Sequence, residues 1–254
     1  MSEHVQIERS NGVVAITLAR PERRNAITVA MYAALADAVE GASADGAVRL
    51  ITIRGLGPDF AAGNDLADFL AARPSDEEMP VWRLLRALAN LDVPLIAAVH
   101  GNCVGIGTTM LLHCDLVLAE EGTRFSLPFV DLGLVPEAAS SLLLPQLAGR
   151  RRAARYLLLA EPFEAREALN IGLVSHVVPA GDLDAALQQI VDALLAKPAE
   201  ALRITHALLR RGQSDAVLER MDIENGHFAE RLQSDEDKTA IGAFFARRGG
   251  RADQ

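Results

Sequence analysis

Short apolar runs that alternate with stretches of helical periodicity dominate the first half of the chain. Strands are predicted at residues 48–54, 95–99, 115–119 and 124–126, and helices at 28–39 and 80–91. Strands separated by helices pair in parallel through right-handed crossovers. The recurring unit has two strands and a helix, which is a poor match to a plain doubly wound sheet.

The two ends of the chain have different patterns. The first strands form a predicted hairpin, in which Asn11-Gly12 is a favoured turn before residues 13–18. After Pro179 no strand pattern remains, and amphipathic helices are predicted at 183–196, 199–210, 215–232 and 236–247. We therefore expect an α/β core over residues 1–196 and a C-terminal helical region over 197–254. No flexible linker separates them, so the helical region is expected to pack on the core or on a neighbouring copy.

Charge and hydropathy exclude several classes of protein. Among 254 residues, 25 Lys and Arg stand against 34 Asp and Glu, and this formal charge of −9 argues against nucleic-acid binding. Only Lys197 and Lys238 are lysines, and neither lies in a phosphate-binding glycine motif. No apolar run is long enough to span a membrane and the first residues do not resemble a signal peptide, so a cytoplasmic protein is expected.

Cysteine and histidine give no sign of a metal site. Cys103 and Cys114 lack the spacing of metal ligands and are expected to be small buried thiols. The 6 histidines form no HExxH motif, and no GxSxG nucleophile motif is present. Structural roles are therefore expected for all the histidines.

Three segments could carry chemistry: residues 60–65 (FAAGND), 101–107 (GNCVGIG) and 134–137 (LVPE). Each follows a predicted strand and precedes a predicted helix, and the carboxyl ends of parallel strands are where α/β proteins bind ligands. The glycine segment is not a dinucleotide motif, since Met110 stands where GxGxxG needs glycine. It is either a tight turn or a loop whose backbone N–H groups stabilise an oxyanion.

Asn64, Asp65 and Glu137 each admit more than one interpretation. Asp65 can cap the helix that follows it, whereas the Asn64 N–H can be a second oxyanion donor. Glu137 can lie in the first turn of a helix, where its charge interacts favourably with the macrodipole. Alternatively, Glu137 is a carboxylate among apolar neighbours, with a raised pKa that suits a general base.

Five motifs together resemble the enoyl-CoA hydratase/isomerase, or crotonase, superfamily: PERRNAIT (21–28), FAAGNDL (60–66), AAVHGNCVGIG (97–107), CDLVLA (114–119) and LPFVDLGLVPEAASS (127–141). The resemblance implies a crotonase-like α/β spiral of ββα units with a C-terminal helical oligomerisation region, assembled as a homotrimer or a dimer of trimers. It also implies an acyl-CoA thioester substrate, with no cofactor beyond the CoA of the substrate and no metal. The family's two oxyanion N–H groups correspond to those of Asn64 and Ile106.

Two departures from the family pattern decide the expected reaction. Hydratases of this superfamily carry two catalytic glutamates, and Thr109 and Phe129 stand at those positions here. Neither side chain can replace a carboxylate as a general acid or base, so hydration by that route is not expected. The peroxisomal type of Δ3,Δ2-enoyl-CoA isomerase resembles the chain closely, and its single catalytic glutamate corresponds to Glu137. One carboxylate suits a 1,3-proton shift from C2 to C4.

Other functions remain open beside this isomerase. They are a hydratase with a different acid and base, a CoA isomerase of the phenylacetate-breakdown type, which has an acid at the same position, and a non-catalytic acyl-CoA-binding module. The Arg23-Arg24 pair is either a contact for the CoA phosphates or a solvated turn, and Asp131 is expected to be structural. The residues expected in the substrate pocket are Arg24, Ala26, Ala62, Gly63, Asp65, Gly105, Thr109, Phe129 and Leu134.

Overall fold

The computed structural model describes residues 2–71, 79–212, 214–234, 236, 239–240 and 242. Its larger sheet has six strands in the order β1-β2-β3-β4-β6-β9. The strands are β1 (Val5–Ser10), β2 (Val13–Leu18), β3 (Leu50–Gly55), β4 (Leu95–Val99), β6 (Leu116–Glu120) and β9 (His176–Val178). β1 and β2 are antiparallel and every later pair is parallel. The predicted hairpin is confirmed, because Asn11 and Gly12 both have the positive φ that its turn requires.

A second sheet of three strands joins β5 (Asn102–Val104), β7 (Arg124–Ser126) and β8 (Phe163–Glu164). The chain alternates between the two sheets. β4 in the larger sheet is followed by β5 in the smaller, and β6 in the larger is followed by β7 in the smaller. This is the expected unit of two strands and a helix, and it agrees with a spiral. The sequence does not predict β5, because this three-residue strand lies between Gly101 and Gly105 and a short run bordered by glycines is typical of a loop.

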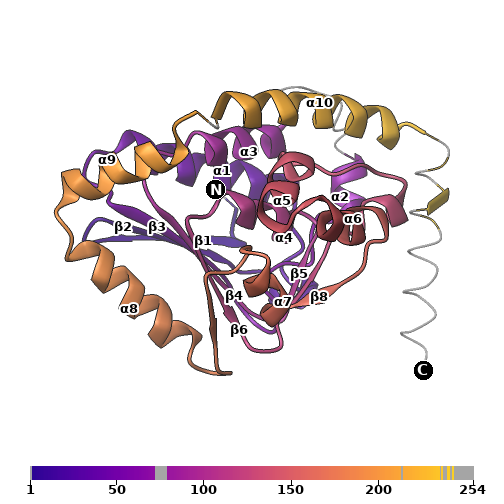
Figure 1. Ribbon diagram of the computed structural model, residues 1–254. Helices are drawn as coiled ribbons and strands as arrows, with labels where there is room; N and C mark the ends of the chain where they lie inside the picture. The colour runs from indigo at the N-terminus through magenta and orange to yellow at the C-terminus, as the bar shows by residue number, and fades with distance from the viewer. Residues whose placement is uncertain are drawn as a thin grey trace.

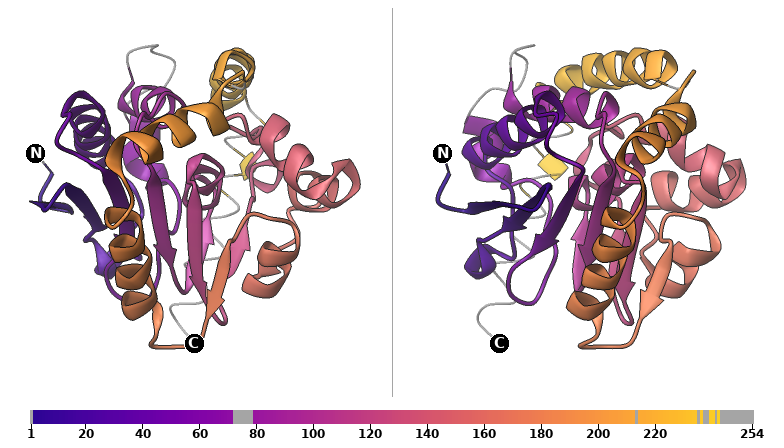
Figure 2. Two further views of the ribbon diagram at one scale, coloured as in Figure 1. Left: turned by 60° about the vertical axis from the view of Figure 1, so that its left-hand side comes forward. Right: turned by 90° about the vertical axis from the view of Figure 1, so that its left-hand side faces the viewer.

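Helices cover both faces of the larger sheet (Figures 1 and 2). The contacting pair α1 (Val29–Ala44) and α3 (Pro80–Ala89) lies on one face, and α8 (Leu183–Leu195) packs on β4 and β6 at the other. The apolar run of β4 serves both faces, because successive side chains of a strand point to opposite sides. Ile96 and Ala98 pack with α8, whereas the remaining β4 side chains belong to the main core.

The C-terminal helices α9 (Ala199–Arg210) and α10 (Ser214–Leu232) lie across the top of the molecule in Figure 1. α10 packs on α3 and on α5 (Ser140–Ala148). The predicted helices at 199–210 and 215–232 are confirmed. The one predicted at 236–247 falls largely outside the described residues, and the division at residue 196 stays a prediction. No helix within the described ranges combines the length and the apolar content that a membrane span needs.

Shorter helical segments connect these elements. The helix predicted after residue 137 is observed as α5, which begins at Ser140. No prediction covers α6, α7, β8 or β9, where turns and amphipathic runs are too short to give a periodic signal. The remaining helical segments of the described chain are η1 (Pro21–Arg23), α2 (Leu66–Ala71), α4 (Ile106–Thr109), η2 (Met110–His113), η3 (Val130–Leu132), α6 (Arg150–Leu158) and α7 (Ala165–Asn170).

Candidate active site

A cavity of about 480 Å³ opens where the three loop segments meet. Ten of the residues predicted for the site line it: Arg24, Ala26, Ala62, Gly63, Asn64, Asp65, Gly105, Ile106, Phe129 and Leu134. Its wall also includes Glu22, Arg23, Leu66, Val104, Pro128, Leu132 and Phe228. Basic side chains therefore stand in the same cavity as an apolar wall from the 128–134 segment.

The first two loops meet because one extends the small sheet. The Val104 N–H donates to the Ala61 carbonyl at 2.9 Å, and the Ala61 N–H donates to the Asn102 carbonyl at 3.1 Å. Residues 60–62 thus pair with β5 in parallel, which the bridge between Ala61 and Cys103 records. Close approach needs glycine, since a Cβ on Gly107 would come within 2.8 Å of the Ala61 Cβ. This contact brings the Asn64 loop and the start of α4 to one wall of the cavity.

The backbone around Asn64 is held in a bridge to Ile27. The Ile27 N–H donates to the Gly63 carbonyl at 2.8 Å, and the Asp65 N–H donates to the Ile27 carbonyl at 2.9 Å. Successive N–H groups of an extended segment point to opposite sides, so the Asn64 N–H points away from Ile27. Ile106 begins α4, so its N–H has no acceptor within that helix. Both backbone groups fit the role of oxyanion donors.

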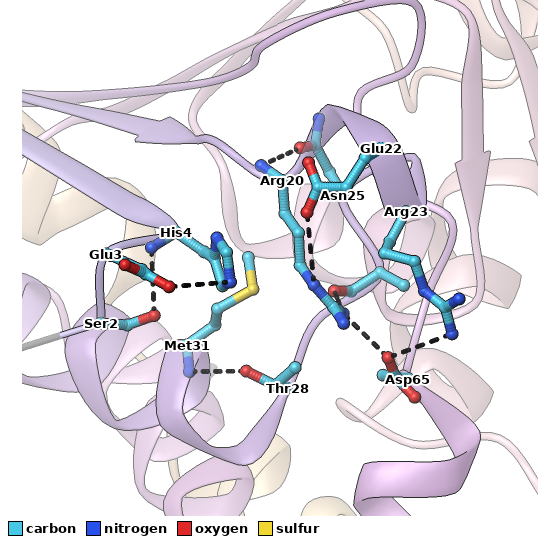
Figure 3. Close-up of polar contacts among 11 residues, drawn as sticks. Ser2, Glu3, His4, Arg20, Glu22, Arg23, Asn25, Thr28, Met31 and Asp65 are labelled. Atoms are coloured by element: carbon cyan, nitrogen blue, oxygen red, sulfur yellow. Dashed lines mark hydrogen bonds and ion pairs between the residues drawn. The ribbon is translucent and has the colours of Figure 1, made fainter.

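Asp65 fastens this loop to the preceding arginines (Figure 3). The Arg20 Nη1 donates to Asp65 Oδ2 at 2.8 Å and to the Ala26 carbonyl at 3.0 Å, and Arg23 lies 3.9 Å from the same carboxylate. Burial opposes ionisation of Asp65, but these hydrogen bonds and charges hold its pKa below the ordinary value. Asp65 also accepts a hydrogen bond from the Asp68 N–H in the first turn of α2, so the predicted capping role is supported together with the predicted place in the pocket wall.

Glu137 lies before a helix and not in one. The predicted alternative of a first-turn glutamate is wrong, because α5 begins at Ser140. The intervening Ala138 and Ala139 have φ of 60° and 54°, a left-handed conformation that residues with a side chain rarely adopt. Such strain is found at functional sites, and nothing in the sequence marks it.

The Glu137 side chain is buried at 3% exposure. Its Oε1 accepts a hydrogen bond from the Thr109 hydroxyl, and its Oε2 has no partner among the described residues. Burial raises the pKa of Glu137 to about 8; the Thr109 hydrogen bond opposes this rise and the charge of Glu224 adds to it. A carboxyl with this pKa can exchange a proton near neutral pH.

Two predicted residues are placed differently from expectation. Thr109 is fully buried and does not belong to the cavity lining, because its hydroxyl turns inward to Glu137. Glu137 is not a lining residue either, although Leu134 and Phe129 of the same segment are. Asp131 is exposed on η3, as suits a residue outside the catalytic machinery.

Tyr32 and Glu224 are two further buried polar residues that interact electrostatically with Glu137, and neither was predicted. The Tyr32 hydroxyl donates to Asn64 Oδ1; burial and the Glu137 charge raise the pKa of Tyr32. Glu224 stands in the buried stripe of α10 with Val217, Met221 and Phe228. The sequence could have indicated both residues. Each is a polar residue at a buried position of a helix, and such a residue needs a buried hydrogen-bond partner.

The arginines, histidines and cysteines have simpler surroundings. Arg23 and Arg24 are about 60% exposed at the cavity, and Arg24 lies 3.6 Å from Asp59. His113 is buried and donates to the Ala138 carbonyl at 2.9 Å, with a pKa lowered to about 4 by burial, so its role is structural. Cys103 and Cys114 are free thiols. The described residues hold no group of three or more His, Cys, Asp or Glu that could bind a metal.

Comparisons with known proteins identify the family. The sequence model described as enoyl-CoA hydratase/isomerase matches residues 8–251. A 1,2-epoxyphenylacetyl-CoA isomerase of Escherichia coli is 31% identical over 98% of this chain and 97% of its own. A 2,3-dehydroadipyl-CoA hydratase of the same organism is 33% identical over 98% and 97%, respectively. A solved enoyl-CoA hydratase/isomerase from Pseudoalteromonas atlantica is 38% identical with a TM-score of 0.91, over 96% of this chain and 98% of that one.

Other relatives include enoyl-CoA delta isomerases of rat and mouse and 4-chlorobenzoyl coenzyme A dehalogenases of Arthrobacter. The names of the relatives therefore cover several reactions of CoA esters, while the structural match shows the crotonase-like fold. With a family match along nearly its whole length, the chain belongs to the enoyl-CoA hydratase/isomerase family.

Proposed function

We propose that this protein is a Δ3,Δ2-enoyl-CoA isomerase in which Glu137 moves the proton. The observation that carries the proposal is the buried Glu137 carboxyl, which has one oxygen held by Thr109, the other without a partner among the described residues, and a pKa near 8. Thr109 and Phe129 occupy the positions of the hydratase glutamates, so Glu137 is left as the acid–base group of the family pattern.

The reaction follows from these groups. The thioester oxygen accepts hydrogen bonds from the N–H groups of Asn64 and Ile106, which stabilise the enolate as it forms. Glu137 removes a proton from C2, the electrons of that C–H bond pass into the enolate, and the C3–C4 double bond moves to C2–C3 as the same proton is returned to C4. No atom is gained or lost. The apolar wall of Phe129, Leu132 and Leu134 favours the neutral acid that exists between the two steps.

Acyl binding must open a path to the carboxyl. Glu137 does not line the cavity, whereas Leu134 and Phe129 do. The acyl chain therefore displaces a side chain of this wall before C2 reaches the carboxyl. The CoA end is assigned to the exposed Arg23 and Arg24, whose guanidinium groups can meet its phosphates.

A side-by-side assay tests the proposal. The protein is given a 3-enoyl-CoA and a 2-enoyl-CoA of equal chain length, and products are separated by chromatography. Isomerisation of the first without hydration of the second is expected. Rapid hydration of the 2-enoyl-CoA with no isomerisation contradicts the proposal, and so does CoA-ester binding without turnover of either compound.

A CoA isomerase acting on an epoxide-type aromatic ester is the second candidate. It is favoured by the similarity to the Escherichia coli 1,2-epoxyphenylacetyl-CoA isomerase along the whole chain. The same assay distinguishes the two when 1,2-epoxyphenylacetyl-CoA is included as a third substrate: preferred turnover of that ester selects the second candidate.

We also propose assembly as a homotrimer or a dimer of trimers in the cytoplasm. On α9 the apolar side chains Ile204 and Leu208, one turn apart, are 47% and 59% exposed, and the next residue, Leu209, is 69% exposed. Apolar faces of this kind are typical of interfaces. The two free cysteines agree with a reducing compartment.

A further inference from the structure

Glu224 is a buried carboxylate on a helix far from Glu137 in sequence. It occupies one position of the apolar stripe of α10 and is 5% exposed, whereas the other stripe residues, Val217, Met221 and Phe228, are apolar. Phe228, one turn later, lines the cavity. The buried side of α10 thus places the Glu224 carboxylate one turn from Phe228, a residue of the cavity wall.

The Glu224 carboxylate holds the start of α5. Its Oε1 accepts a hydrogen bond from the Ser141 N–H at 2.9 Å, while Arg220, one turn earlier, donates to the Ser141 hydroxyl at 3.1 Å. Its Oε2 is buried and has no partner among the described residues. Figure 1 shows α10 lying along this part of the molecule, close to α5.

Ser141 is joined to Glu137 by a strained piece of backbone. Ala138 and Ala139 both have left-handed φ values and are completely buried. From one side His113 donates to the Ala138 carbonyl, and from the other Glu224 accepts from Ser141. These two hydrogen bonds hold residues 138–141, the segment that directly follows Glu137.

We propose that Glu224 is a positioning residue for Glu137, because it holds the strained 138–141 backbone through the Ser141 amide. A negative charge on Glu224 also disfavours the charged form of Glu137. The inference rests on the proposed role of Glu137 as the proton carrier. The polar and charged groups that face this pair are Tyr32 from α1 and Thr109 from α4 toward Glu137, and Arg220 and Ser141 toward Glu224. Burial raises the pKa of Glu224, and its hydrogen bonds to Ser141 and the Arg220 charge oppose that rise.

Two substitutions separate the two parts of the role. Glu224→Gln keeps an oxygen that can accept the Ser141 N–H but removes the charge, so kcat is expected to stay within about 3-fold, while the pH at which Glu137 ionises moves down. Glu224→Ala removes the acceptor, so kcat per folded molecule is expected to fall roughly 10- to 100-fold with KM within about 2-fold, because the carboxyl is misplaced. Asp222→Asn is the matched control, since Asp222 is an exposed acid on the same helix that pairs with Arg86.

Ionisation of Glu137 is measured directly by infrared titration, following the carboxylic-acid band that disappears in Glu137→Gln. This readout does not depend on turnover, so absence of isomerase activity refutes the proposed function without deciding the role of Glu224. A Glu137 midpoint that does not move in Glu224→Gln overturns the inference, even when Glu224→Ala fails to fold. Wild-type kcat in Glu224→Ala overturns it as well. The control is expected to match wild type in both measurements.

Discussion

The hydroxyl of Thr109 donates a hydrogen bond to the carboxylate of Glu137, and both side chains are buried. The same hydroxyl lies 3.4 Å from the Gly105 carbonyl. A hydroxyl has one proton to donate, so it can donate to ionised Glu137 and turn to Gly105 when Glu137 is protonated. The Thr109 hydroxyl thus stabilises the charged form of Glu137.

Replacing Thr109 is expected to change the pH dependence more than the maximal rate. Thr109→Ala or Thr109→Val should leave isomerisation at high pH within a few-fold of wild type and raise the pKa of Glu137, because a hydrogen bond to the charged form is lost. Pre-steady-state rates as a function of pH measure both quantities. Thr108→Val is the control, since the Thr108 hydroxyl bonds to the Cys103 carbonyl instead. A loss on the order of 10³ in Thr109→Ala would mean that the hydroxyl takes part in proton transfer.

Glu137→Gln removes the base and keeps the shape. We expect normal binding of acyl-CoA and a loss of at least about two orders of magnitude in kcat. Calorimetric titration with a non-reactive saturated acyl-CoA measures the binding, and the isomerase assay measures the rate. Asp131→Asn is the comparison, because Asp131 is an exposed acid of the same segment. Full activity of Glu137→Gln, or a loss confined to Asp131→Asn, shows that another carboxylate is responsible.

Because the pKa of Glu137 is raised, its burial is predicted to lower the free energy of unfolding more at high pH than at low pH. A carboxyl whose pKa rises from 4.5 to about 8 on folding favours the folded state fully below the unfolded value, and this contribution is lost as pH rises through about 8. The melting temperature of Glu137→Gln relative to wild type should therefore increase between about pH 5 and about pH 9. The kcat/KM of the wild type should rise over the upper part of that range, since the ionised form is the base. A pH-independent difference in melting temperature contradicts the assignment.

Arg23 and Arg24 are expected to attract the phosphates of CoA. Changing both to Ala should weaken CoA binding and flatten its dependence on salt, because attraction between exposed charges is screened by ions. Affinity is measured by calorimetry at low and at moderate ionic strength. The double change of Arg151 and Arg152 to Ala is the control, as both lie on the exposed side of α6. Equal affinity of the Arg23/Arg24 variant and wild type at low salt places the phosphates elsewhere.

The apolar side of α9 predicts an oligomer. Light scattering at micromolar concentration should give the mass of a trimer or of a dimer of trimers. Leu208→Glu together with Leu209→Glu should lower that mass, because charges at an apolar interface are costly to bury. A wild-type monomer contradicts the proposed assembly.

Much of the architecture could be predicted from local pattern. The strand at 95–99 and the helix at 199–210 have the predicted bounds, because each is an uninterrupted run with one periodicity. β5 and the segment around Ala138 could not be predicted in this way. β5 exists through pairing with a strand more than twenty residues later, and the left-handed alanines are held by contacts from His113 and Glu224.

The same difference holds for the site. Asn64, Ile106 and the apolar wall lie at the cavity as predicted, since each belongs to a motif read within a few residues. Thr109 was expected in the pocket but faces Glu137, because the direction of a side chain on a four-residue helix depends on what packs beneath it. Tyr32 and Glu224 come from distant helices, so only the folded chain brings them to Glu137.

Asp65 interacts with both the arginine behind the Asn64 loop, Arg20, and an arginine at the basic end of the cavity, Arg23. Its carboxylate is shared by Arg20, which secures the loop of Asn64, and by Arg23 at the basic end. Under the proposed function, a CoA phosphate that binds Arg23 competes with Asp65 for its guanidinium group and leaves the Asp65 carboxylate to Arg20. The nucleotide phosphates and the thioester group of the substrate then both affect the position of Asp65. A truncated ester without the nucleotide should therefore react more slowly as well as bind more weakly.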